Sequence, residues 1–179
     1  MRKKQLLALD GDQILFDWVS SFIGYVIKQG HQLSIENFGK TYSLHTWFTT
    51  MSEVRFKELV VEYNSHEHPP LFAGVIDIIP KLLEKYEVCV VSSYSSCPDT
   101  SARRKNILLA LGIHNIFLLD LGESKLDTLH EIGADIFVDD SVKHMKEGLE
   151  AGCEVYAIEY PYNKGVDGVK YIKSLEELL

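Results

Sequence analysis

Two aspartates follow directly after a short apolar run near the start of the sequence. Residues 6–9 read Leu-Leu-Ala-Leu, Asp10 comes next, and Asp12 stands two positions later. An unbroken apolar run of this length is typical of a strand buried on both faces of a parallel sheet. Ligands of open α/β sheets bind at the carboxyl edge, where such strands end. The two carboxylates are therefore placed for chemistry, although Asp10 and Gly11 alone could equally begin an ordinary turn.

Other reactive side chains follow later apolar runs. Ser92 and Ser93 come after residues 87–91, and the adjacent acids Asp139 and Asp140 come after residues 135–138. Lys125 stands near the start of a predicted helix between these two runs. Because crossover connections bring the ends of parallel strands to one edge, these groups are expected to meet. Each group also has an alternative interpretation without chemistry. The serines could belong to a serine-rich loop, Lys125 could be a surface residue, and the two adjacent acids could form a turn or a helix N-cap.

Several carboxylates at one edge would repel one another unless a divalent cation lay among them. Ligation by oxygen alone suits magnesium. A magnesium ion, a lysine and a hydroxyl around an aspartate are what phosphoryl transfer requires, since they neutralise the phosphoryl oxygens and leave a positioned nucleophile. An aspartate can itself be that nucleophile and form an aspartyl-phosphate.

The elements that position these groups fall into two blocks. Residues 18–70 contain no convincing strand and are predicted to form a helical insertion after the first strand. A first helix is capped by Asp17 and stopped by Gly30, and a second carries a capping box of Thr50 and Glu53. The length of 179 residues suits one well-cored domain with such an insertion.

From residue 74 onward, helices alternate with short apolar strands, as in a parallel α/β sheet. After the first strand at residues 6–9, further strands are predicted at 87–91, 116–119, 135–138 and 155–158. Helices are predicted to begin at Thr100 or Ser101, at Ser124 and at Val142, and a closing helix to carry a Ser174–Glu177 capping box. Pro80 should kink the helix at residues 75–85 or mark its true start.

Composition limits the possible partners. The formal net charge of −8 disfavours binding to a nucleic acid polymer or an anionic membrane. No apolar run approaches the ~20 residues that span a bilayer, and the N-terminus does not read as a signal peptide, so a soluble cytoplasmic protein is expected. The three cysteines lack zinc-ligand spacing and fit reduced thiols.

Four motifs in order, "LDGDQ", "VVSS", the lysine of "SKLD" and "FVDDS", make the chain resemble the haloacid dehalogenase superfamily of aspartate-nucleophile phosphatases. The resemblance spans nearly the whole chain. It implies an α/β three-layer Rossmannoid sandwich with a central parallel sheet and a small helical cap after the first strand. The core domain would comprise residues 1–17 and 71–179, and the cap residues 18–70.

The same resemblance implies a role for each motif residue. Asp10 would be the nucleophile and a magnesium ligand, and Asp12 the general acid and base, with its backbone carbonyl on the metal. Ser92 would hydrogen-bond the phosphoryl group and Lys125 would balance its charge.

Magnesium would be bound directly by Asp140 and through water by Asp139. Gln13 departs from the pattern, because a glycine is usual there, so the turn after Asp12 is expected to be altered.

Within the superfamily, the helical insertion and the "PYN" segment at residues 161–163 resemble the 5'(3')-deoxyribonucleotidases. The expected substrate is a deoxynucleoside monophosphate, with Ser93, Tyr42, Trp47 and Phe48 as candidate substrate-binding residues. Another small phosphate ester, such as a sugar phosphate, is the main alternative. A receiver-like module is disfavoured by motif order, and a catalytically weak phosphate-binding member remains open.

Overall fold

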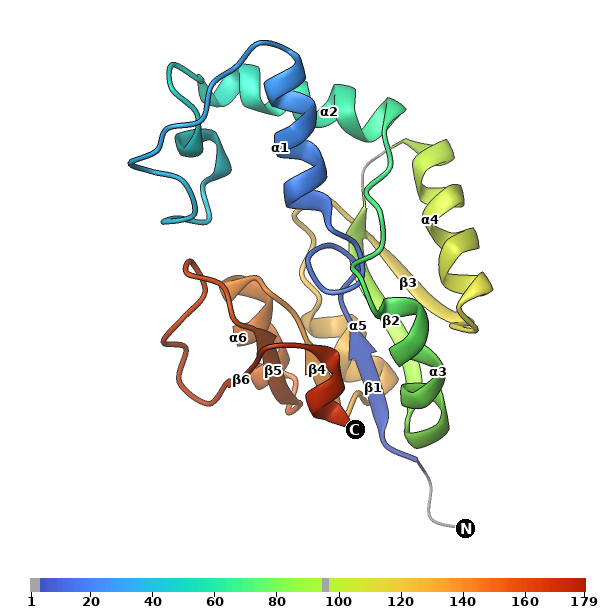
Figure 1. Ribbon diagram of the computed structural model, residues 1–179. Helices are drawn as coiled ribbons and strands as arrows, with labels where there is room; N and C mark the ends of the chain where they lie inside the picture. The colour runs from blue at the N-terminus through green and yellow to red at the C-terminus, as the bar shows by residue number, and fades with distance from the viewer. Residues whose placement is uncertain (1–3, 95–96) are drawn as a thin grey trace.

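A six-stranded parallel sheet forms the centre of the protein, whose computed structural model describes residues 4–94 and 97–179 (Figure 1). The order is β3-β2-β1-β4-β5-β6, and every neighbouring pair is parallel. The strands are β1 (Leu6–Leu9), β2 (Glu87–Tyr94), β3 (Asn115–Asp120), β4 (Ile136–Val138), β5 (Glu154–Ile158) and β6 (Lys170–Ile172). The predicted α/β fold with a central parallel sheet is confirmed.

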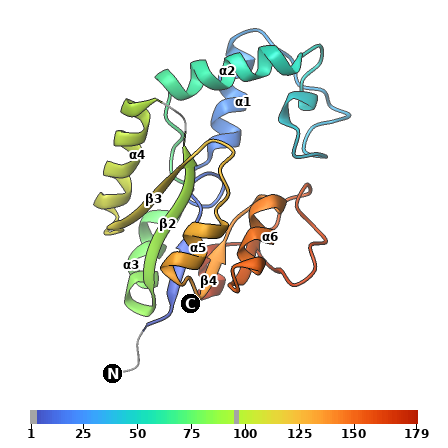
Figure 2. The same cartoon turned by 180° about the vertical axis from the view of Figure 1, so that it is seen from behind.

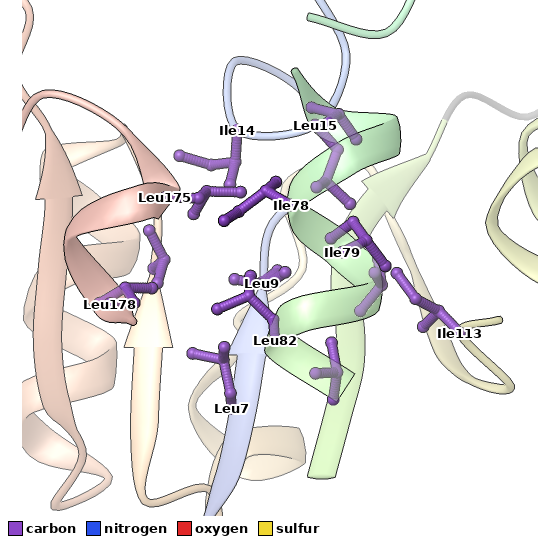
Figure 3. Packing of buried hydrophobic residues seen from close by; sticks show 14 of the residues in the cluster. Leu7, Leu9, Ile14, Leu15, Ile78, Ile79, Leu82, Ile113, Leu175 and Leu178 are labelled. Carbon is purple, nitrogen blue, oxygen red and sulfur yellow. The ribbon is translucent and has the colours of Figure 1, made fainter. Parts of the chain in front are cut away.

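Helices cover both faces of this sheet and make it the middle of three layers. Helices α3 (Val75–Lys85) and α4 (Pro98–Ala110) and the 3₁₀ turn η2 (Leu175–Leu178) lie on one face, and α5 (Leu126–Ile132) and α6 (Val142–Glu150) on the other (Figures 1 and 2). Within β1, Leu7 and Leu9 pack toward α3 and η2 (Figure 3). Ala8 packs toward α5 and α6 on the other face. Burial on both faces explains the unbroken apolar run. None of the helices in the described ranges is long and apolar enough to cross a bilayer.

Residues 18–70, called the cap segment below, lie beyond the carboxyl ends of the strands (Figure 1). They contain α1 (Trp18–Lys28), the 3₁₀ turn η1 (Leu44–Trp47) and α2 (Glu53–His66). The two helices and η1 enclose an apolar cluster that is separate from the two clusters of the sheet and includes Phe22, Leu59 and Tyr63. The only β pairing within the segment is an isolated bridge, so the prediction of a strand-free insertion is confirmed.

Three predicted helix starts are wrong by a few residues. Helix α2 is capped by Ser52, whose hydroxyl accepts from the Arg55 N–H, and not by Thr50, which has a left-handed backbone. Helix α4 begins at Pro98 instead of Thr100 or Ser101, because proline is well suited to the first helical position. Helix α5 begins at Leu126, whose N–H donates to the Ser124 hydroxyl.

The C-terminal region also differs from the prediction. Strand β6 was not expected, because three residues give too little periodicity to read. The closing element is the single 3₁₀ turn η2, and no capping box forms, since the Glu177 carboxylate accepts from the Lys173 N–H. Pro80 lies inside α3 and does not mark its start, which is at Val75.

Close packing of α6 on the sheet yields a stability prediction with a matched control. A Cβ at Gly148 would lie 2.6 Å from a Phe137 ring carbon and 3.0 Å from a Val155 methyl, whereas a Cβ at Gly24 of α1 meets nothing within 4 Å. We expect Gly148→Ala to lower the free energy of unfolding by about 1–3 kcal/mol through overpacking. Gly24→Ala should leave it unchanged or raise it by up to about 1 kcal/mol through helix propensity. Denaturant unfolding measures both, and equal effects would contradict the packing of α6.

Candidate active site

The acidic residues meet where the strand order reverses. From β1 the chain builds outward through β2 and β3 on one side and through β4, β5 and β6 on the other. The crevice at such a reversal, outside the carboxyl ends of the strands, is where open α/β sheets bind ligands. Asp10 leaves β1 with its N–H donating to the Val138 carbonyl of β4 at 2.9 Å. Carboxylate oxygens of Asp10, Asp139 and Asp140 consequently lie within 4.8 Å of one another, and all three residues are buried.

A buried lysine holds two of these acids. The Lys125 side chain has no exposed surface, and its Nζ donates to Asp10 Oδ1 and to Asp139 Oδ2, each at 2.7 Å. Burial opposes its charge, but the carboxylates of Asp10 and Asp139 outweigh burial and raise the Lys125 pKa above its usual value. Burial likewise opposes the charge of Asp139, yet Lys125 and His144 lower the pKa of that carboxyl to about 2.

Electrostatics leave this cluster short of positive charge. The pKa of Asp140 is raised well above its ordinary value by burial and by the neighbouring Asp139 and Asp10. Burial also raises the pKa of Asp10, with Asp139 adding to the effect and Lys125 opposing it. When all three carboxylates are ionised, one ammonium group leaves two negative charges, which one divalent cation would neutralise.

The donor set fits magnesium, because the ligand atoms that the three acids of this cluster offer are all carboxylate oxygens. Asp139 uses Oδ1 to accept from the Ser141 N–H at 2.7 Å and Oδ2 to accept from Lys125. Asp140 uses only Oδ2, which accepts from the Tyr162 hydroxyl at 2.7 Å. Among hydrogen bonds of the described residues, 4–94 and 97–179, Asp140 thus keeps an oxygen that Asp139 does not.

Ser92 reaches the site from β2, the other neighbour of β1. Its hydroxyl accepts from the Gly11 N–H at 3.3 Å. A Cβ at Gly11 would lie 2.8 Å from that hydroxyl oxygen, so glycine is required for this close approach. Ser93 also lines the cavity described below, and its buried hydroxyl has no hydrogen-bond partner among the residues the structure describes.

Asp12 is paired with an arginine to which sequence reasoning gave no definite role. Arg104 Nη1 lies 2.6 Å from Asp12 Oδ1, and the arginine side chain is only 5% exposed. Burial raises the pKa of Asp12 to about 6, with Arg104 opposing the rise. From the sequence, Arg103 and Arg104 could equally be solvated helix charges or anion contacts, and nothing local distinguishes the two.

Gln13 keeps the tight turn that was expected to change. Its φ of 62° lies in the left-handed region that glycine would favour. The side-chain oxygen accepts from the Val19 N–H at 3.0 Å, in the first turn of α1. The turn after Asp12 is therefore retained and tied to the cap segment.

A cavity of about 400 Å³ opens above these groups, between the sheet edge and the cap segment. Asp10, Asp12, Ser92, Lys125 and Asp140 all line it. From the cap segment it is lined by a mixture of aromatic, aliphatic and polar side chains, which include Trp18, Val19, Tyr42, His45, Phe56, Lys57, Val60 and Asn64.

Of the three predicted cap aromatics, only Tyr42 lines this cavity. Trp47 and Phe48 are buried in the apolar cluster of the cap segment, and the Trp47 indole N–H donates to the Thr41 carbonyl at 2.8 Å. The prediction that these two contact a substrate is not supported by their placement, because a cap this small needs them for its own core.

The "PYN" segment after β5 joins the acidic cluster to the cap segment. Tyr162, whose hydroxyl donates to Asp140, packs its ring against Tyr42 with centroids 5.6 Å apart. The Asn163 amide donates to the backbone carbonyl of Asp140 at 3.0 Å. The sequence singled out this segment only as a resemblance and gave neither residue a role.

Comparison with known proteins supports the fold. No family model and no curated protein matches the sequence. Among solved structures, HAD-hydrolase YfnB from Bacillus subtilis, bound to magnesium, matches with a TM-score of 0.60 and 20% identity over 99% of this chain and 97% of that one. A haloacid dehalogenase-like family hydrolase from Streptococcus pneumoniae matches with a TM-score of 0.65 and 18% identity over 99% and 98%. This chain has the haloacid dehalogenase-like fold.

D,D-heptose 1.7-bisphosphate phosphatase from B. bronchiseptica, complexed with magnesium and phosphate, shares this haloacid dehalogenase-like fold, with a TM-score of 0.57 and 15% identity over 97% of each chain. TM-scores of this size show a common fold. At identities this low, they show nothing about the reaction, which has to be argued from the site itself.

The charge deficit of the cluster predicts a response to magnesium that does not depend on turnover. Saturating magnesium should raise the melting temperature by about 5 °C, because a cation that binds only the folded state stabilises it. Asp140→Asn removes one of two uncompensated charges, so the metal-free variant should be at least as stable as the parent and should lose most of the magnesium response. The melting temperature is measured by thermal unfolding, and sodium chloride at the same ionic strength is the control for a general salt effect. The same magnesium response in Asp140→Asn would contradict the site.

Proposed function

We propose that this protein is a magnesium-dependent phosphomonoesterase that acts through an aspartyl-phosphate. The observation that carries the proposal is the cluster of Asp10, Asp139 and Asp140 around the buried Lys125 ammonium, open to a cavity at the carboxyl edge of the sheet. When its carboxylates are ionised, the cluster lacks two positive charges, which a divalent cation would supply. A phosphate ester is a substrate that such a cation activates and that a carboxylate can attack.

The chain's own residues divide the reaction between them. An Asp10 oxygen attacks phosphorus, the bond from phosphorus to the ester oxygen breaks, and Asp12 gives its proton to the departing alcohol. Water then attacks the aspartyl-phosphate and transfers a proton to Asp12, while the bond from phosphorus to Asp10 breaks and phosphate is released. Ser92 and Lys125 hold the phosphoryl oxygens. Bound magnesium would supply charge neutralisation and would be held by Asp10, Asp140 and the Asp12 carbonyl, with Asp139 through water.

Asp10→Asn tests the nucleophile. The amide has nearly the shape of the carboxylate but is a poor nucleophile, so turnover of any phosphomonoester should fall by at least about 1,000-fold while the fold is retained. Steady-state kinetics and thermal unfolding are measured on the same sample. Substantial activity in folded Asp10→Asn protein, free of contaminating phosphatase, would overturn the covalent mechanism.

For the substrate, we propose a deoxynucleoside monophosphate. A cavity of about 400 Å³ is within the range that holds small-molecule ligands. Val19, Phe56 and Val60 offer an apolar wall to a flat base. A sugar phosphate is the second candidate, favoured by the polar side chains His45, Lys57 and Asn64 in the same wall.

A substrate panel distinguishes these candidates. Deoxynucleoside and ribonucleoside monophosphates, sugar phosphates and para-nitrophenyl phosphate are compared by kcat/KM. We expect the highest value for a deoxynucleotide, and a lower value for its ribonucleotide, because an apolar contact at the 2' position would bury the extra hydroxyl without a partner. A clear preference for a sugar phosphate would keep the phosphatase and overturn the nucleotidase. No turnover of any member, with retained phosphate binding, would favour a binding module.

A further inference from the structure

We infer that Arg104 is a positioning residue that holds the Asp12 carboxyl in the orientation needed for proton transfer to the leaving alcohol. This inference rests on the phosphomonoesterase function proposed above. It is carried by the ion pair between Arg104 Nη1 and Asp12 Oδ1 and by the burial of the arginine in the wall of the cavity that holds Asp10.

Asp12 needs an external anchor. Its side chain is about one-third exposed, in contrast with the buried side chain of Asp10. The backbone around it is fixed, since the Leu15 and Phe16 N–H groups both donate to the Gly11 carbonyl at 2.9 Å. The side chain has no such restraint from its own turn. Arg104, with its guanidinium over the Phe16 ring at 5.4 Å, supplies that restraint from α4.

The form of the contact leaves Asp12 able to react. Arg104 donates to one carboxylate oxygen of Asp12, Oδ1, and within residues 4–94 and 97–179 no hydrogen bond to Oδ2 is formed. A two-pronged arginine contact would occupy both oxygens. A contact on Oδ1 alone fixes the plane of the carboxyl group and leaves Oδ2 to exchange a proton with the ester oxygen.

Arg104 is also separate from the charge balance of the metal cluster. Lys125 pairs with Asp10 and Asp139, whereas the carboxyl group with which Arg104 forms an ion pair is that of Asp12. Loss of Arg104 should therefore impair the step that depends on Asp12 and spare nucleophilic attack by Asp10.

Leaving-group dependence tests this division. Single-turnover release of the alcohol, with enzyme in excess, reports the first step alone. A deoxynucleoside monophosphate, or the best alkyl ester of the panel, needs a proton on its leaving oxygen, whereas para-nitrophenolate departs without one. We expect Arg104→Met to slow the alkyl ester about 100-fold and the aryl ester by less than about 3-fold. Arg104→Lys, which keeps a cation, should recover part of the alkyl rate.

Two controls complete the experiment. Arg103→Met alters the exposed neighbour on the same helix and should leave both rates unchanged. Asp12→Asn should show the same leaving-group selectivity as Arg104→Met, and the double variant should be no slower than Asp12→Asn alone by more than about 3-fold, because the two residues act as one unit.

The outcomes separate the two proposals. Equal slowing of both esters in Arg104→Met, or additive losses in the double variant, would overturn the positioning role while the phosphatase stands. Absence of alcohol release from every ester by the parent protein with magnesium would overturn the proposed function and this inference with it.

Discussion

The buried ammonium of Lys125 is the contact on which the rest of the site depends. It joins the end of β1 to the end of β4 by binding Asp10 and Asp139, each at 2.7 Å. Without it, Asp10 and Asp139 would lose the ammonium group that pairs with both, and removal of one partner of a buried ion pair costs about 3–5 kcal/mol. One ammonium group cannot balance three ionised carboxylates, so the cluster would still attract a divalent cation.

Sheet topology explains how Lys125 reaches Asp10 and Asp139, although both are distant from it in sequence. Lys125 precedes Asp139 by 14 residues, and α5 accounts for half of that interval. The helix begins beside the carboxyl edge and returns the chain to the start of β4, as a crossover in a parallel sheet requires. The lysine therefore lies at the N-terminal end of its helix and the aspartate at the far end of the next strand, and both arrive at one edge.

The part of the site that could be predicted lies at strand ends. Asp10, Ser92 and Asp139 follow apolar runs, so the rule that parallel strands share one carboxyl edge was enough to bring them together. Arg104 could not be found in this way, because it lies in the middle of α4 and its partner Asp12 is 92 residues away. Of the cap aromatics, Tyr42 lines the cavity, whereas Trp47 and Phe48 do not, for another reason. Residue type does not tell which side of a small helical cluster is its core, and Trp47 lies in that core.

Hydrogen bonds and ring contacts join the cap segment to the loops that carry Asp12 and Asp140. The Gln13 side chain binds the first turn of α1, and its backbone carbonyl accepts from the Tyr160 hydroxyl at 3.2 Å. Tyr160 stacks on Tyr162, whose hydroxyl holds Asp140 and whose ring contacts Tyr42 of the cap segment. Movement of the cap segment would thus be transmitted both to the turn that carries Asp12 and to Asp140. The cap segment and the acidic cluster are thus joined by one chain of contacts, and together they line the cavity in which we propose that the phosphate ester binds.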